Sequence, residues 1–394
     1  MGVTTMEQQK AKLAKVVWPA TLTVASVLFG WHAGGGFATG NQANQFYVIT
    51  GWFGPLSALL ALLLLTLVVR EAMIMYNRNH MTSYKQLFET LYHPFDKLEL
   101  VFEVYFYIMI LMAISASIAG SGQLLQDIAS ISYPVAVSVV GVVLLVLTMF
   151  GAELVRKAST IMTALILVTA VCIFIIGITQ KKDVIVQIFQ AGPTWRHLPL
   201  AILKTFQYAG FQCAAIPTMI AVGTVLATPK DSKKSMWIAF ALSSLVLCLS
   251  VVMLLGWSAV YGAVEGGSTI PTLTVAKQLG SPLLIIAYYV CLFLCFVSTA
   301  VAAIFGVAGR FSGIKAFSRI RNEKTRSALL SSAVMLISMG VSLVGLTNII
   351  KYGYGYCGYV GIAFIVIPFL TVGVYKNRKA EKAVRMADEA QHGA

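Results

Sequence analysis

Residues 26–45 read SVLFGWHAGGGFATGNQANQ, in the middle of a long apolar stretch. Three consecutive glycines, residues 34–36, interrupt this stretch. Glycine costs a helix interior about 1 kcal/mol relative to alanine, so three in a row favour a break in the helix. In a membrane, non-helical backbone is tolerated only where protein or a water-filled cavity covers it. The stretch therefore predicts a transmembrane helix that is broken near its middle, beside a cavity at mid-membrane depth.

Polar side chains surround the predicted break. His32, Thr39, Asn41 and Gln42 all fall within the apolar stretch. Polar groups at membrane depth are costly and commonly serve a functional site. The alternative interpretation is that the glycine spacing of this stretch only provides a small-residue face for close packing between helices.

The composition places the whole chain in the membrane. Its 394 residues are 58% hydrophobic and 11% charged, with a mean hydropathy of +0.82. Soluble domains do not reach such values, whereas polytopic helical membrane proteins do. The first apolar run is too long for a cleaved signal peptide, so we expect it to be retained as a span. The net charge of +14 does not indicate nucleic acid, because the basic residues lie in short loops. The six cysteines lack metal-ligand spacing and are expected to be small buried side chains.

The apolar pattern predicts an all-α polytopic protein with about ten spans of roughly 20 or more residues each. Their approximate ranges are 18–47, 52–76, 98–126, 133–150, 155–179, 197–227, 235–261, 282–309, 327–347 and 350–375. A polar, basic tail, residues 1–17, precedes them, and a second polar tail, 376–394, follows.

The positive charges predict the orientation. With an even number of spans, both termini lie on the same side. If that side is the cytoplasm, 23 of the 29 Lys and Arg residues fall in inner segments. Membrane proteins concentrate Lys and Arg in their cytoplasmic loops, so we expect both termini to be cytoplasmic.

Two connections are longer than turns. Residues 77–97 carry Tyr84, Leu87, Phe88 and Leu91 at helical spacing among charged residues, which predicts an amphipathic helix on the inner surface. On the outer side, residues 265–281 contain a short apolar run of their own. This connection is expected to cap an outer vestibule.

The sixth span repeats the anomaly of the first. Residues 204–217 read KTFQYAGFQCAAIP, and the Ala-Gly-Phe within them matches the Gly-Gly-Phe of span one. Pro217 follows, where a new helix would start. Because spans one and six each open a group of five, the two groups, 18–179 and 197–375, must cross the membrane in opposite directions. Paired interrupted helices in two inverted halves indicate the binding site of a transporter.

Broken helices offer their own ligands. A half-helix begins with free N–H groups that suit a carboxylate, and it ends with free carbonyls that suit Na⁺. Ser298 and Thr299, at the centre of span eight, could add two hydroxyl oxygens, which a hard cation prefers. The alternative is that these hydroxyls only bond to carbonyls of their own helix.

These three features together resemble the amino acid–polyamine–organocation superfamily: GGGFATG after an apolar half-helix, the AGF motif five spans later and the Ser-Thr pair in span eight. Within it, the GFATG-type motif most resembles the YkvI-like membrane proteins. The resemblance covers spans one to ten and implies a LeuT-type fold of five plus five inverted helices, with spans one and six broken. It also implies a substrate pocket between spans one, three, six and eight in a bacterial cell membrane.

The resemblance also implies site residues. An Na⁺ ion would be held by the carbonyls of Gly30, Ala33 and Cys295 and by the hydroxyls of Ser298 and Thr299. The substrate would contact Gly34, Gly35, Gly36, Phe37, Thr39, Tyr208, Gly210 and Gln212. Tyr107 and Leu111 are the candidates from span three, chosen by depth.

Two residues leave the coupling ion open. His32 stands where many members of the superfamily have an apolar or small residue, and an imidazole can titrate near neutral pH and couple protons. Otherwise it is a packed, neutral side chain. Glu103 either pairs with a basic residue of an inner loop or belongs to a cytoplasmic gate. The resemblance also bears on the ion, because proton-coupled relatives can place a lysine of span five in the sodium position. Span five here has none beyond Lys157 at its inner end, which favours Na⁺ over H⁺.

The hypothesis is a secondary active transporter, sodium-coupled, for an amino acid or a related small organic solute. We expect it to have no cofactor besides the coupling ion, to bind no nucleic acid and to be a monomer or homodimer in the bilayer. A proton-coupled or uncoupled carrier of the same fold, or a transport-deficient sensor, stays open as the alternative. The sequence has no HExxH motif and no acid pair inside the membrane, which argues against an enzyme. A channel would not need two related breaks.

Overall fold

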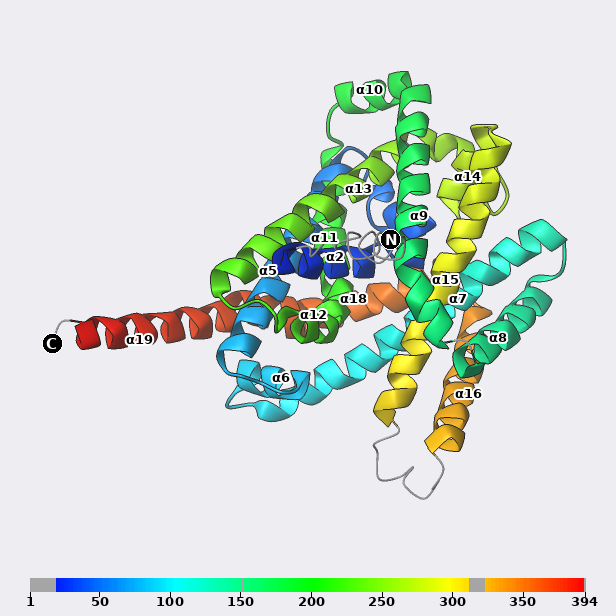
Figure 1. The fold of residues 1–394 in the computed structure, drawn as a ribbon. Coiled ribbons are helices and arrows are strands. Elements are labelled where there is room, and N and C mark those ends of the chain that lie inside the picture. The colour runs from blue at the N-terminus through cyan, green and yellow to red at the C-terminus, as the bar shows by residue number, and fades with distance from the viewer. Residues whose placement is uncertain (1–18, 151, 312–322, 393–394) are drawn as a thin grey trace, which may run out of the picture.

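The computed structural model describes residues 19–150, 152–311 and 323–392, and this part of the chain is helical without strands. Figure 1 shows the arrangement. In the first half the helices are α2 (Ala20–His32), α3 (Gly35–Ala38), α4 (Asn41–Phe46), α5 (Gly54–Arg78), α6 (Tyr84–Tyr92), α7 (Glu99–Ala129), α8 (Tyr133–Phe150), α9 (Ala152–Gln180) and α10 (Lys182–Gln190). In the second half they are α11 (Leu198–Gln212), α12 (Ile216–Gly223), α13 (Pro229–Ala263), α14 (Pro271–Gln278), α15 (Pro282–Phe311), α16 (Glu323–Ser342), α17 (Leu346–Asn348), α18 (Gly355–Gly361) and α19 (Val374–His392).

These helices confirm the predicted class, an all-helical polytopic membrane protein. Within the described ranges, five continuous stretches are long and apolar enough to cross a bilayer: Val48–Arg78, Asp96–Ala129, Pro229–Ala263, Pro282–Ile304 and Leu346–Ala383. A sixth, Leu165–Gln180, bends by 72° into α10. Three shorter apolar helices and the α11–α12 pair lie where the other predicted spans were placed. The predicted tail 1–17 lies outside the described residues.

The first span is broken where the glycines predict it. Helix α2 ends at His32, Gly34 is extended, and α3 begins at Gly35. A second bend follows at Gly40, whose φ of +77° lies in the left-handed region that only glycine adopts without strain. Span one is therefore three helical pieces rather than two.

The sixth span corrects the prediction in one respect. The motif at residues 209–211 is helical, and the helix narrows to a 3₁₀ turn two residues after it, over Cys213–Ala215. Pro217 stands in the first turn of α12, as expected. The motif is therefore not the break. Its glycine, Gly210, instead allows a close contact between two helices, since a Cβ there would overlap the backbone carbonyl of Gly358 in α18.

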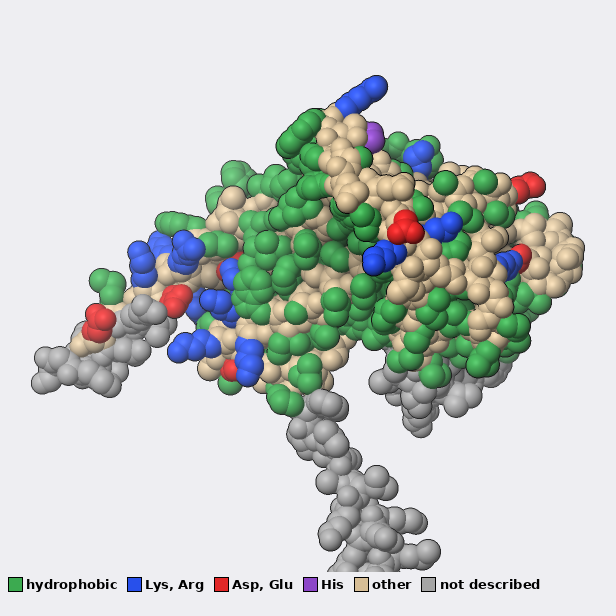
Figure 2. Space-filling view, turned by 90° about the horizontal axis from the view of Figure 1, so that it is seen from above, with side chains coloured by type: hydrophobic (Ala, Val, Ile, Leu, Met, Phe, Trp, Pro, Cys, Tyr) green, Lys and Arg blue, Asp and Glu red, His purple; other side chains and the backbone are tan. Residues whose placement is uncertain are grey.

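Short helices mark the two ends of the bundle. The predicted amphipathic helix is confirmed as α6, with Leu87, Phe88 and Leu91 buried. The predicted outer connection carries α14. Figure 1 places α6 and α19 at one end and α10 and α14 at the other. In Figure 2, hydrophobic side chains cover most of the face shown, while Lys and Arg gather on the side from which α19 projects.

Candidate functional site

Four buried polar side chains join the first span to the sixth. His32 lies at the end of α2. The side-chain amide of Gln212 donates a hydrogen bond from its Nε2 to the Nδ1 of His32, with 3.1 Å between the two atoms. The Tyr208 hydroxyl lies 3.3 Å from the same nitrogen and donates to Gln42 Oε1 at 3.2 Å. The exposed fraction of these four side chains is 6% or less. The two interrupted helices therefore meet through one polar cluster, His32–Gln42–Tyr208–Gln212.

The cluster leaves one hydrogen-bond donor unused. An amide nitrogen can only donate, so the bond from Gln212 makes His32 Nδ1 an acceptor. A neutral imidazole then carries its proton on Nε2, and that nitrogen is buried with no partner in the described part of the chain. Buried polar groups are nearly always bonded, so this N–H suits an acceptor oxygen of a ligand or a water molecule.

Aromatic rings enclose the polar cluster. The ring of Tyr208 lies 4.8 to 5.5 Å from the rings of Phe46, Tyr47 and Phe211, and the Phe37 ring lies 5.0 Å from that of His32. The Tyr47 hydroxyl is a second buried polar atom without a partner among the described residues. The site thus combines apolar walls with a few directed polar groups, as small-molecule sites usually do.

The glycines of the break are in tight contact with side chains from other spans. A Cβ added at Gly35 would lie 2.5 Å from Cδ1 of Phe296 in α15, and one added at Gly120 of α7 would overlap the same ring. A Cβ at Gly36 would overlap the Gln42 amide. Phe296 and Gln42 thus pack directly against the glycines of the break, where the sequence predicts a cavity.

The backbone at the break has free ends, as expected. The last helical bond of α2 runs from the Ala33 amide to the Phe29 carbonyl at 2.8 Å, so the carbonyls of residues 30–33 lie beyond it. The first bonds of α3 run from Phe37 and Ala38 to the Gly34 carbonyl, both at 3.0 Å. These carbonyls include those of Gly30 and Ala33, which the resemblance assigns to Na⁺.

The Ser-Thr pair follows Phe296, the residue that packs on Gly35, by about one turn of α15. Thr299 follows Phe296 by three residues on α15, so it shares a helix face with the ring that packs on Gly35. Both hydroxyls bond to the Cys295 carbonyl, at 3.0 Å from Ser298 and 2.8 Å from Thr299. These two bonds within one helix are those that the alternative interpretation predicts. They also bring three predicted ion ligands close together: the hydroxyl oxygens of Ser298 and Thr299 and the carbonyl oxygen of Cys295.

Span three reaches the site through a residue that the sequence reasoning missed. Tyr105 is buried and donates to the carbonyls of Gly210 and Phe211 at 2.7 and 2.8 Å, just before the 3₁₀ turn of span six. Tyr107 and Leu111 lie on a half-buried face of α7. The buried residues 102, 105 and 109 are spaced so that they share one face of α7. This helical spacing is the feature of the sequence that could have identified Tyr105.

Glu103 lies at the end of the bundle that carries α6. Its carboxylate accepts a hydrogen bond of 2.6 Å from the hydroxyl of Tyr84 in α6. Beside it, Lys85 is 3.3 Å from the carboxylate of Glu99, and this bond raises the pKa of the lysine. Glu103 therefore helps to fix α6 against α7.

The second half of span one, after the break, is bonded to the connection 265–281. Asn41 donates to the Thr269 carbonyl and to the Thr347 hydroxyl, both at 2.9 Å, and the Thr272 amide donates to the Thr39 carbonyl at 3.2 Å. Tyr288 of α15 donates to the Ala38 carbonyl. The connection 265–281 and α15 thus cover α3 and α4.

Comparison with known proteins gives a fold and a distant relative. No protein-family model matches the chain. It is 22% identical over 374 residues to the uncharacterized membrane protein YkvI of Bacillus subtilis (strain 168), covering 91% of this chain and 96% of that one.

Solved structures share the fold at low sequence identity. The structure of MhsT in complex with L-phenylalanine has a TM-score of 0.63 at 16% identity, over 87% of both chains. A substrate-bound Na⁺-coupled sialic acid symporter gives 0.59 at 12%, over 91% of this chain and 90% of that one. Inward-facing Mhp1 gives 0.52 at 10%, over 91% of both. The chain therefore has the fold of these proteins across most of its length, and that fold includes cation-coupled symporters.

Proposed function

We propose that this protein is a secondary active transporter that couples the uptake of an amino acid or a related small organic solute to Na⁺. The observation that carries the proposal is the buried cluster of His32, Gln42, Tyr208 and Gln212, which joins two interrupted spans and leaves one N–H unpaired. The shared fold of a Na⁺-coupled symporter and of a protein solved with an amino acid supports it.

The substrate lies, in this proposal, between the cluster and the break. The unpaired Nε2–H of His32 donates to a carboxylate or carbonyl oxygen of the solute. The aromatic rings of Phe37, Tyr208 and Phe211 exclude water and contact its apolar part. Gly34, Gly35 and Gly36 allow a close approach to the backbone.

Transport follows from alternating access. Na⁺ binds the carbonyls of Gly30 and Ala33 together with the oxygens of α15, which ties span one to span eight. Ion and substrate both favour the state in which the break is ordered, and this shared preference is the coupling. Entry of the solute from the outside requires that the bonds of Asn41 to residues 268–269 and Thr347 open. Both termini lie in the cytoplasm of a bacterial cell.

The proposal is tested by uptake into proteoliposomes with an inward Na⁺ gradient. Radiolabelled amino acids are screened one at a time, with a K⁺ gradient and an H⁺ gradient of equal size as comparisons. Saturable uptake of a solute that needs the Na⁺ gradient supports the proposal. Uptake driven by H⁺ alone favours the proton-coupled alternative, and binding without transport favours the sensor.

Replacing Thr299 with Ala should weaken the response to Na⁺. The change removes one predicted ion ligand, and a lost bond to a charged group costs about 1.5–3 kcal/mol, so the half-saturating Na⁺ concentration should rise by about tenfold or more. The measurement is the Na⁺ dependence of uptake. Thr371→Ala is the matched control, because the Thr371 hydroxyl makes the same bond to a carbonyl four residues earlier, on an exposed face. Equal Na⁺ responses in the two variants would remove Thr299 from the ion site.

Replacing His32 with Gln should weaken substrate binding without changing the pH profile. The imidazole bonds to a hydroxyl and an amide, and neither carries a charge that would stabilise an imidazolium. We therefore expect KM to rise by about tenfold, as for the loss of one buried hydrogen bond. The measurement is uptake between about pH 5.5 and about pH 8.5, a range that contains the ordinary histidine pKa of about 6.5. A profile that shifts in the variant would assign proton coupling to His32.

A further inference from the structure

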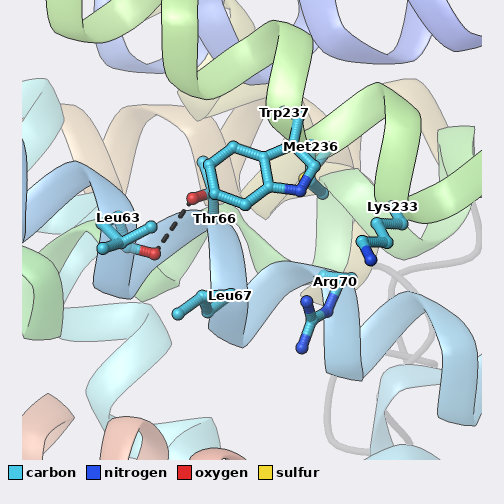
Figure 3. Close-up of a pocket in the computed structure, with 7 residues that line it drawn as sticks. All are labelled: Leu63, Thr66, Leu67, Arg70, Lys233, Met236 and Trp237. Carbon is cyan, nitrogen blue, oxygen red and sulfur yellow. Dashed lines mark hydrogen bonds between the residues drawn. The ribbon is translucent and has the colours of Figure 1, made fainter.

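A groove between α5 and α13 combines an apolar floor with two positive charges at one end. Figure 3 shows Leu63, Thr66 and Leu67 of α5 along one wall and Trp237 of α13 across from them. The α5 residues 63, 66, 67 and 70 share one helix face, and so do the α13 residues 233, 236 and 237. Arg70 and Lys233 therefore lie at the same end of the groove, near the end of α5 and the start of α13.

The charge at this end is positive. Arg70 bonds to Glu71 through Nε and Nη2, at 2.9 and 2.5 Å, and both bonds go to a single carboxylate oxygen. The guanidinium keeps Nη1 as a further donor. Lys233 is exposed and pairs with no described side chain. The nearby carboxylate of Asp231 is used in the N-terminal cap of α13, with the backbone and hydroxyl of Thr228.

The surface beyond the charges is apolar on both helices. Leu56, Leu59 and Leu60 of α5 are 37% to 47% exposed, and Leu242 and Leu245 of α13 are 39% and 61% exposed. In a spanning protein such side chains face acyl chains. Trp237 is 47% exposed near the charged end, the place that tryptophan prefers at the boundary of a membrane.

We propose that this groove binds an anionic phospholipid. Its phosphate lies between Arg70 and Lys233, and one acyl chain runs along Leu63, Leu67 and Trp237. The apolar walls select a lipid over a free phosphate, because an inorganic anion gains nothing from them. The unpaired lysine selects a net negative headgroup over a zwitterionic one, since basic pockets between helices on the cytoplasmic side hold such headgroups. The predicted orientation places the site in the cytoplasmic leaflet. This site does not depend on the proposed transport activity.

Native mass spectrometry of the purified full-length chain tests the site. The protein is released from detergent micelles containing equal amounts of dioleoyl phosphatidylglycerol and dioleoyl phosphatidylcholine, and the retained lipids are counted. We expect preferential retention of phosphatidylglycerol. Lys233→Gln should reduce this preference by about fivefold, the effect of one basic residue at a membrane surface.

Lys234→Gln is the matched control. It removes the same charge from the next residue of α13, which does not line the groove. The control should keep the preference for phosphatidylglycerol, and glycerol 3-phosphate should not displace the lipid. Equal retention of the two lipids by the wild type would overturn the proposal, as would equal losses in the two variants. Displacement by glycerol 3-phosphate would instead assign the site to a free phosphate compound.

Discussion

Gly35→Leu should reduce solute uptake by at least about tenfold while the protein still inserts in the membrane. A Cβ at this position would lie 2.5 Å from the Phe296 ring, which also packs on Gly120. Leucine must displace that ring, and overpacking of this kind costs roughly 1–3 kcal/mol. It also favours continuous helix across the break and fills the proposed substrate space. The measurement is uptake into proteoliposomes, normalised to inserted protein.

Gly340→Leu is the control for this variant. A Cβ at Gly340 in α16 would meet nothing within 4 Å, so the same substitution adds the same bulk without a contact. We expect wild-type uptake from the control. Wild-type uptake by Gly35→Leu would show that the break does not line the substrate path.

Gly210→Leu should destabilise the whole protein, beyond any effect on transport. A Cβ at Gly210 would overlap the Gly358 carbonyl, and a Cβ at Gly361 would overlap the Gly210 carbonyl. The two backbones of α11 and α18 are thus in direct contact, and backbone cannot move aside as a flexible side chain can. Small residues permit such contacts between membrane helices. We expect a cost of about 3 kcal/mol or more, and a melting temperature lowered by roughly 6–10 °C.

The melting temperature in detergent, followed by tryptophan fluorescence, checks this expectation. Gly262→Leu is the control, because a Cβ at Gly262 would meet nothing within 4 Å. If both variants melt like the wild type, the contact between α11 and α18 does not determine stability.

The sequence predicts the helices and the first break because these follow from local chemistry. Apolar length marks each span, and residues 34–36 mark the break whatever surrounds them. The amphipathic period of residues 84–92 likewise predicts α6 without reference to its neighbours. Short elements of mixed composition carry a weaker signal: residues 182–190 fall between two predicted spans, with no prediction of their own, and form the helix α10.

Contacts between distant spans could not be read from the sequence. Gly210 looked like part of a break, yet its role is set by Gly358, which no local pattern connects to it. Depth alone selected Tyr107 in span three, whereas the rotation of α7 turns Tyr105 towards span six. Phe296 was overlooked because a phenylalanine in an apolar helix carries no signal of its position beside Gly35.

The most direct test of sodium coupling is the melting temperature of the purified wild-type protein in Na⁺, K⁺ and N-methyl-D-glucamine at equal ionic strength. A ligand that binds only the folded state raises its stability by mass action, by about 2.7 kcal/mol at a hundredfold excess over Kd. We predict a rise of several degrees in Na⁺ alone, which a transported amino acid increases further. Equal melting temperatures in the three salts at saturating concentration would contradict the sodium site.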